Sequence, residues 1–338
     1  MMKSRFVHIT LAALLAMVVP GRCLAADDPA PESPLIDSNE VSPDEVAATV
    51  NGEPVTLGAV NEAMKGVLQG RSLNPATLPL LQAEVLSQLI DRELLTQMLA
   101  KSGKAAPDTE ITQAFDQVKR QAEEKKVDLA KSLADRGLTE EQFREQLAWQ
   151  INWAKFLQTA LTGSVMRKYF EAHKRHFDGT ELRVSHILMR PDSAGSPAET
   201  ERLTKMAEKL RGHIESGKLT FEEAAKKYSA GPSRHKGGDL GMIPRNGLML
   251  EQFTAAAFSL EKGKISQPVV TPYGVHLIKV TDEKPGRKIW SEVKEAIKGP
   301  ATQAIFEKLA AAEREKAKID YTGKCPHFKP GTRTLATE

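Results

Sequence analysis

The chain has 338 residues, with 47 Lys and Arg against 44 Asp and Glu, and a formal charge of +3. Three of the basic residues, Lys3, Arg5 and Arg22, lie within residues 1–25, which contain no acidic residue, so the rest of the chain has no net charge. A nucleic-acid binder would keep a basic surplus in its folded part, and we therefore expect no nucleic-acid partner. The length and a hydrophobic content of 41% predict about two domains with real cores.

The first 25 residues have the features of a signal peptide. Lys3 and Arg5 provide a basic start, residues 6–19 are almost all apolar, and residues 23–25 end in the small side chains that a cleavage site needs. The apolar run is too short to span a bilayer comfortably, and an uncleaved anchor is the alternative. No later stretch is apolar enough to cross a membrane. We expect an exported protein without stable membrane insertion after cleavage, with the periplasm favoured over the cell exterior.

The cysteine and histidine content argues against a metal centre. Without residues 1–25 the chain keeps one cysteine, Cys325, so neither an intramolecular disulfide nor a cysteine-based zinc site is possible. His173 and His176 are three residues apart, but no third ligand follows at a spacing typical of zinc. The glycine-rich stretch at 237–241 has the order of neither a dinucleotide-binding loop nor a P-loop. We expect no metal and no cofactor.

Apolar residues recur at helical spacing in the first half of the mature chain. The pattern predicts several helices between residues 78 and 161, the last of which begins at Thr139 with a capping box. Trp149 and Trp153 lie four residues apart on this last helix. They are interpreted either as packing between helices or as an apolar contact for an unfolded client protein.

Both ends of the mature chain contribute to one predicted domain. Two short strands flank a turn at 51–52, soon after Val46. Towards the other end, a helix predicted at about 288–316 has apolar residues at every fourth position, and an exposed apolar stripe of this length would be a liability. The N-terminal helices are its simplest partner. Residues 318–321 are expected to add a strand beside the one near Val46.

Residues 182–281 change character, and their pattern predicts an α+β domain in the order strand, helices, strand, helix, two strands. This region resembles the parvulin-type peptidyl-prolyl isomerases in four consecutive segments: RVSHILM at 183–189, YSAGPSRHKGGDLG at 228–241, LMLEQFTAAAF at 248–258 and VVTPYGVHLIKV at 269–280. The flanking segments VNGEPVT and LIDRELLTQMLAKSG, with the final helix, resemble the SurA/PrsA class of exported foldases.

The resemblance implies an α+β fold with an inserted domain. A parvulin domain, which is a four-stranded antiparallel sheet with surrounding helices, interrupts a mainly α-helical chaperone domain built from both chain ends. The expected organisation is a signal peptide at 1–25, a disordered linker at 26–45, helical domain at 46–178, parvulin domain at 180–283, a completing helix and strand at 287–322, and a disordered tail at 323–338.

Isomerisation of an X-Pro bond calls for a particular kind of site. Rotation about a peptide bond costs about 18–20 kcal/mol, and no covalent bond has to be made or broken. The enzyme must favour the twisted amide, which has lost resonance and is less polar around its C–N bond. Such a site needs an apolar pocket for the proline ring, and polar groups near the carbonyl and the prolyl nitrogen.

The resemblance implies which residues form this site. Leu240, Met249 and Phe253 match the family's proline pocket, and the last two are expected on one face of a short helix because they are four residues apart. His186 and His276 match the family's paired histidines. Their expected role is either a hydrogen-bonded pair that shapes the site or a direct part in catalysis.

Four further residues complete the expected site. Thr271 is expected to extend the network of the paired histidines. Gly231 departs from the family pattern, because many members carry Asp or Cys there, and Ser229, Ser233 or backbone N–H groups of the glycine-rich loop are candidates to replace that side chain. Arg245, with the basic stretch 234–236, makes the rim of the pocket basic. This rim is interpreted either as a solvated loop or as tolerance for an acidic residue before proline.

Two functions follow from these features. The first is an exported peptidyl-prolyl cis-trans isomerase that assists folding of secreted or envelope proteins without a covalent intermediate. The second is a holdase chaperone whose parvulin domain binds proline-containing clients with little or no turnover. In both cases the expected partners are unfolded or partly folded exported proteins with X-Pro bonds, and the pattern makes no prediction of oligomeric state.

Overall fold

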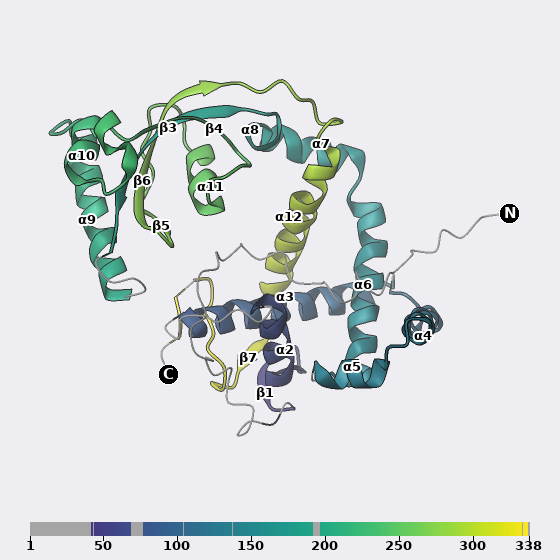
Figure 1. Ribbon diagram of the computed structural model, residues 1–338. Coiled ribbons are helices and arrows are strands. Elements are labelled where there is room, and N and C mark those ends of the chain that lie inside the picture. Colours follow the sequence, from purple (N-terminus) through teal and green to yellow (C-terminus); the bar gives the residue numbers. More distant parts are fainter. Residues whose placement is uncertain are drawn as a thin grey trace. The chain divides into compact units, whose positions relative to one another are not determined.

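The computed structural model describes residues 42, 44–68, 77–103, 105–136, 138–191, 197–332 and 334–336 (Figure 1). The predicted signal peptide at 1–25 and most of the predicted linker at 26–45 lie outside these ranges. The chain divides into two compact units. The first unit holds the described residues up to Leu161 and those from Thr302, and the second unit is Thr162–Ala301. No helix in the described ranges is long and apolar enough to span a membrane.

The first unit contains a three-stranded antiparallel sheet built from both parts of the chain. Its strands are β1 (Val46–Val50), β2 (Glu53–Thr56) and β7 (Ile319–Tyr321), in the order β2-β1-β7. Asn51 and Gly52 both have positive φ, which is the backbone of a tight hairpin turn. Because β7 pairs with β1, the second unit is inserted between two segments of the first, and the predicted insertion is confirmed.

Helices form most of the first unit: α2 (Leu57–Leu68), α3 (Leu78–Lys101), α4 (Asp108–Glu124), α5 (Leu129–Asp135), α6 (Glu140–Ala160) and the C-terminal part of α12 (Lys294–Arg314). One core cluster joins β1, α2 and α3, and another joins α4, α5 and α6. Thr139 caps α6 by accepting a hydrogen bond from Gln142 N, as the capping box predicts. α12 begins later than predicted because Ile289 N donates to the Glu292 carboxylate and holds a turn there.

The predicted disordered tail at 323–338 is wrong for its described part. Cys325 is 2% exposed and lies in the core cluster of β1, α2 and α3. Phe328 and Leu335 form an antiparallel bridge. Burial raises the pKa of the Cys325 thiol to about 11. The buried Cys325 side chain packs in this core and holds the segment around it in a defined position.

The second unit is built on a four-stranded antiparallel sheet. Its strands are β3 (Glu181–Met189), β4 (Asp239–Pro244), β5 (Val269–Thr271) and β6 (Gly274–Lys284), in the order β4-β3-β6-β5. The helices of this unit are α7 (Gly163–Ala172), α8 (Lys174–Phe177), α9 (Pro197–Glu215), α10 (Phe221–Tyr228), the 3-10 helix η2 (Pro232–Lys236) and α11 (Glu251–Ser259). This architecture confirms the predicted α+β fold.

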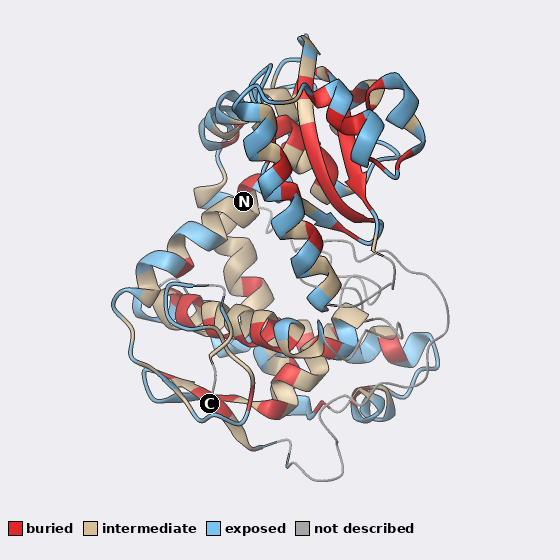
Figure 2. Cartoon of the chain, turned by 90° about the vertical axis from the view of Figure 1, so that its left-hand side faces the viewer, coloured by how far each residue is buried: buried red, intermediate tan, exposed pale blue. Residues whose placement is uncertain are grey.

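Each face of this sheet has its own core. Successive side chains of a strand point to opposite faces. Ile187 and Leu277 therefore belong to a cluster with α9 and α10, whereas Val184 and Ile278 belong to a cluster with α11. Buried residues follow the long strands of this sheet in Figure 2. The face that α11 covers carries the functional site.

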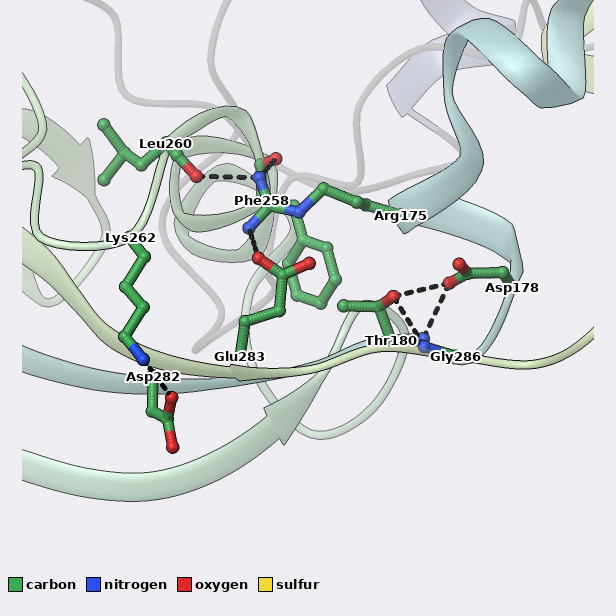
Figure 3. A network of polar contacts seen from close by, with 9 residues as sticks. All are labelled: Arg175, Asp178, Thr180, Phe258, Leu260, Lys262, Asp282, Glu283 and Gly286. Atoms are coloured by element: carbon green, nitrogen blue, oxygen red, sulfur yellow. Dashed lines mark hydrogen bonds and ion pairs between the residues drawn. The ribbon is translucent and has the colours of Figure 1, made fainter.

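Polar contacts tie together the two chain segments that enter and leave the sheet (Figure 3). The Asp178 carboxylate accepts hydrogen bonds from Thr180 N at 2.8 Å and Thr180 Oγ1 at 2.6 Å, and Gly286 N donates to Thr180 Oγ1 at 3.0 Å. A Cβ on Gly286 would lie 2.1 Å from Asp178 O, so only glycine allows this approach. Arg175 pairs with Glu283 and also donates to Leu260 O at the end of α11.

Candidate active site

The two histidines nominated by the sequence meet on one face of the sheet. His186 lies on β3 and His276 on the neighbouring strand β6, with His276 opposite Leu188 in the register. Their Nδ1 atoms are 3.3 Å apart and the rings are stacked with centroids 5.5 Å apart. Both side chains are buried, with 7% and 5% exposure. The structure therefore brings the pair together as a hydrogen-bonded unit.

Thr271 extends this pair, as the sequence predicts. Its Oγ1 lies 2.8 Å from His276 Nε2, accepts from Tyr273 N at 3.2 Å and lies 3.3 Å from Gly274 O. Gly274 has φ +130°, and a Cβ there would lie 2.2 Å from Met189 O. Only glycine lets the β5–β6 turn approach β3 this closely, and this turn holds the Thr271 hydroxyl against His276.

The histidine pair carries no positive charge at neutral pH. Burial lowers the pKa of His186 below its usual value of 6.5. Burial, with a smaller effect from His186, lowers the pKa of His276 from 6.5 to about 4. Both imidazoles are therefore neutral near pH 7, because the charged form would lose its hydration without gaining an anionic partner.

Phe253 of α11 forms an apolar wall beside the histidines. Its ring meets the ring of His186 edge-on at 5.8 Å and that of His276 at 5.5 Å, and the side chain is 4% exposed. Leu240 of β4 packs against the cluster that contains Phe253. The structure thus places two of the three predicted pocket residues in one apolar cluster beside the imidazoles.

Met249 does not lie on the helix where the sequence predicts it. α11 starts at Glu251, after Leu250 in an extended conformation caps it. Leu250 O accepts hydrogen bonds from Phe253 N and Thr254 N, so the first helical turn forms after Met249. The expectation that Met249 and Phe253 share a helical face is therefore wrong. Met249 is 39% exposed, in the segment that leads into α11.

Arg245 has a protein partner of its own. Its guanidinium pairs with both carboxylate oxygens of Glu251 and donates to Thr254 Oγ1 at 3.0 Å. These contacts join the end of β4 to the first turn of α11, and the side chain is only 16% exposed. Residues 234–236 of η2, in contrast, are exposed. A role for Arg245 towards a substrate stays a prediction.

Ser229 and Gly231 shape the loop that faces His186. Ser229 Oγ accepts hydrogen bonds from Leu188 N and Gly231 N, both at 3.1 Å, so its two lone pairs are already used. A Cβ on Gly231 would lie 3.0 Å from His186 Nε2 and 3.3 Å from Ser229 Oγ. The loop backbone therefore packs directly against Nε2 of His186.

Sequence reasoning missed the glycine that supports this loop. Gly238 O accepts a hydrogen bond from His186 N at 2.9 Å, and a Cβ on Gly238 would lie 2.3 Å from His186 O. Only a residue without a side chain can approach the β3 backbone in this way. The Gly-Gly pair at 237–238 was the available signal; it belongs to a parvulin-like segment, but the pattern gave it no role in the site.

The described ranges contain no group of three or more His, Cys, Asp or Glu side chains that could hold a metal ion. His173 Nδ1 is 2.9 Å from Tyr169 O, and its ring stacks on Tyr169 with centroids 4.1 Å apart. These contacts account for His173, one of the two histidines that sequence spacing had raised as possible ligands.

Both parts of the chain match known protein families. Residues 186–282 match the family model of the PPIC-type PPIase domain, and residues 35–157 match that of the SurA-like N-terminal domain. The first match contains the histidine pair, Phe253 and the Gly231 loop. The second match ends within α6 of the first unit.

Individual relatives of the chain are named as foldases, chaperones or peptidylprolyl isomerases. The foldase protein PrsA of Bacillus subtilis is 29% identical over 239 residues, which cover 70% of this chain and 71% of the relative. The chaperone SurA of Alcanivorax borkumensis is 25% identical over 253 residues, 72% of this chain and 58% of the relative. A crystal structure of the peptidylprolyl isomerase PrsA from Bacillus anthracis is 26% identical, with a TM-score of 0.36, and covers 68% of this chain and 96% of that one. The chain therefore contains a SurA-like N-terminal domain and a PPIC-type, or parvulin-type, PPIase domain, and its relatives are named foldase protein PrsA and chaperone SurA.

Proposed function

We propose that this chain isomerises X-Pro peptide bonds in unfolded or partly folded exported proteins, without a covalent intermediate. The observation that carries the proposal is the edge-on packing of Phe253 against both rings of the neutral histidine pair. A proline ring bound beside Phe253 would lie next to uncharged polar groups in an apolar setting. Such surroundings favour the twisted amide, whose C–N bond is less polar than that of the planar form.

The neutral state of the histidines supports this mechanism. A charged imidazole would interact most strongly with the planar, more polar amide and would therefore stabilise the ground state. His276, with a pKa of about 4, keeps its neutral form across the whole range in which exported proteins fold. Catalysis then depends on shape and dipoles, and no proton has to be transferred to the substrate.

A protease-coupled isomerisation assay on X-Pro peptides tests the proposal. The wild-type chain is expected to accelerate isomerisation well above the rate in buffer. Met249→Ala, at the rim of the proposed pocket, is expected to raise KM, while Leu248→Ala is the matched control, because Leu248 is fully exposed next to Met249. His276→Ala is expected to lower kcat. A wild-type rate equal to that in buffer would rule out the isomerase.

A row of aromatic side chains in the first unit favours holdase activity as a second candidate. Trp149, Trp153 and Phe156 of α6 stack in sequence, with centroids 5.5 Å and 5.3 Å apart. Phe306 of α12 packs edge-on against both tryptophans, so they do pack between helices, but none of the three α6 rings is fully buried. Stacked, partly exposed rings suit apolar segments of an unfolded client. Suppression of client aggregation by the wild-type chain, weakened by Trp153→Ala but not by Met249→Ala, would separate this activity from the isomerase.

Export of the chain is proposed from residues 1–25. N-terminal sequencing of the protein recovered from the periplasm or the medium is expected to start close to Ala26. Recovery of the intact N-terminus in the membrane fraction would favour the uncleaved anchor. The relatives named PrsA and SurA support a foldase role. The compartment of this chain is determined by the N-terminal sequencing.

A further inference from the structure

The hydrogen bonds of Thr271 indicate which ring nitrogen of His276 carries the proton. Thr271 Oγ1 has a single hydrogen and three polar neighbours: Tyr273 N, Gly274 O and His276 Nε2. Tyr273 N can only donate and Gly274 O can only accept. All three contacts are satisfied at once when the Thr271 hydroxyl donates to Gly274 O and accepts from His276 Nε2. This arrangement places the proton of His276 on Nε2.

The same arrangement determines the proton of the second histidine. A neutral imidazole has one N–H and one lone pair, so His276 Nδ1 is then an acceptor. The only ring nitrogen of His186 within hydrogen-bond distance of it is Nδ1, at 3.3 Å. His186 must therefore donate from Nδ1, and its Nε2 carries a lone pair.

The other end of the network, at Gly231, supports the same direction independently. His186 Nε2 is buried and has no hydrogen-bond partner among the described residues. A Cβ on Gly231 would lie only 3.0 Å from it, so the bare loop backbone covers this atom. A buried N–H without an acceptor costs about 1–3 kcal/mol, and orphaned buried donors are rarer than under-satisfied acceptors. A lone pair on Nε2 is therefore the better tolerated state.

We propose that a one-way hydrogen-bond chain runs from His186 through His276 and Thr271 to Gly274 O, and that Gly231 is the positioning residue that sets its direction. In this arrangement His186 is protonated at Nδ1 and His276 at Nε2. Gly231 sets the direction because it offers His186 Nε2 no polar side chain. The backbone of Gly231, with φ −76° and ψ 154°, is open to any residue, so a polar side chain can be introduced there without backbone strain.

Histidine tautomers in the full-length protein provide the direct test. Two-bond proton–nitrogen correlation spectra of protein labelled with nitrogen-15 histidine distinguish Nδ1–H from Nε2–H. The two signals are assigned from His186→Gln and His276→Gln variants. The expected result at pH 7.5 is Nδ1–H for His186 and Nε2–H for His276. The opposite pair of tautomers, or an equal mixture, would overturn the proposal.

Two variants at position 231 test the role of the glycine. Gly231→Asp places a carboxylate next to His186 Nε2, which should draw the proton of His186 to that nitrogen and reverse the chain. His276 is then expected to change from Nε2–H to Nδ1–H. Gly231→Ala, the matched control, crowds the same atom without a polar group and should leave both tautomers unchanged. A folded Gly231→Asp protein with wild-type tautomers would show that Gly231 does not set the direction.

This test measures the free protein and requires no isomerase activity. A chain that failed to accelerate X-Pro isomerisation would contradict the proposed function and leave the tautomer assignment standing. Wrong tautomers in an active enzyme would have the reverse meaning.

Discussion

The first unit ties α3 to α12 with an ion pair, whereas the second unit places two neutral imidazoles at its functional site. Arg314 pairs with Asp91 and donates to Ser87 O at 2.8 Å. His186 and His276, in contrast, bond to each other and to Thr271. A charged pair gains from opposite charges and connects two distant chain segments. A neutral pair keeps the electric field around it small, which the proposed isomerase mechanism requires.

Breaking the ion pair is expected to have the largest effect. Arg314→Ala leaves Asp91 unpaired in a partly buried position, where the two side chains are 29% and 21% exposed. We expect a loss of about 3 kcal/mol in the free energy of unfolding, at the lower end of the cost of unpairing a buried charge. Urea denaturation of the full chain in a Trp290→Phe background, in which only Trp149 and Trp153 of the first unit fluoresce, measures it.

A double variant separates the charge from the packing. Asp91→Leu with Arg314→Met replaces both ions by apolar side chains and should recover most of the lost stability. If the double variant is as unstable as Arg314→Ala, the loss comes from packing, and the contrast between the two units would weaken.

Acid should act on the neutral pair. The pKa of His276 falls from 6.5 in the unfolded chain to about 4 in the folded one. The unfolded state therefore binds more protons between these values, so the contribution of His276 is complete above pH 6.5 and is lost as the pH falls towards 4. At about 1.36 kcal/mol per pKa unit, the free energy of unfolding should fall by about 3 kcal/mol by pH 4. Denaturation of wild type and His276→Gln from pH 7.5 to 4 measures the difference, which should shrink with acid.

Removing the hydroxyl that ends the histidine network should have a moderate effect. Thr271→Val keeps the shape of the side chain but leaves His276 Nε2 and Tyr273 N without their partner. We expect a loss of about 1–2 kcal/mol for the unpaired buried groups. Thermal unfolding of wild type, Thr271→Val and Thr271→Ser compares them, and Thr271→Ser should stay closest to wild type. A loss in Thr271→Ser as large as that in Thr271→Val would mean that the hydroxyl contributes no more to stability than the methyl group.

Removal of an exposed ion pair is expected to have the smallest effect on stability. Lys205 and Glu201 are 2.6 Å apart on α9, and their side chains are 67% and 66% exposed. Exposed pairs contribute little, because water and salt screen them. Lys205→Ala should leave the unfolding midpoint of the protein unchanged. A clear shift in that midpoint would mean that exposure is a poor guide to the energetic weight of polar contacts in this chain.

Elements that depend on neighbouring residues could be predicted from the amino-acid sequence. The capping box at Thr139 and the hairpin turn at Asn51-Gly52 are local hydrogen-bond and backbone preferences. The order of the parvulin-like segments led to His186 and His276 as a pair.

The partners of side chains that are distant in the sequence could be seen only in the folded chain. Arg245 pairs with Glu251, and Cys325 packs in the core of β1, α2 and α3, although neither contact leaves a periodic signal in the sequence. Met249 lies outside α11 because the helix begins only after its N-cap residue, Leu250. The position of Gly231 against His186 Nε2 likewise depends on how closely two backbones approach. Local patterns specify elements, but close packing between elements specifies the chemistry of this site.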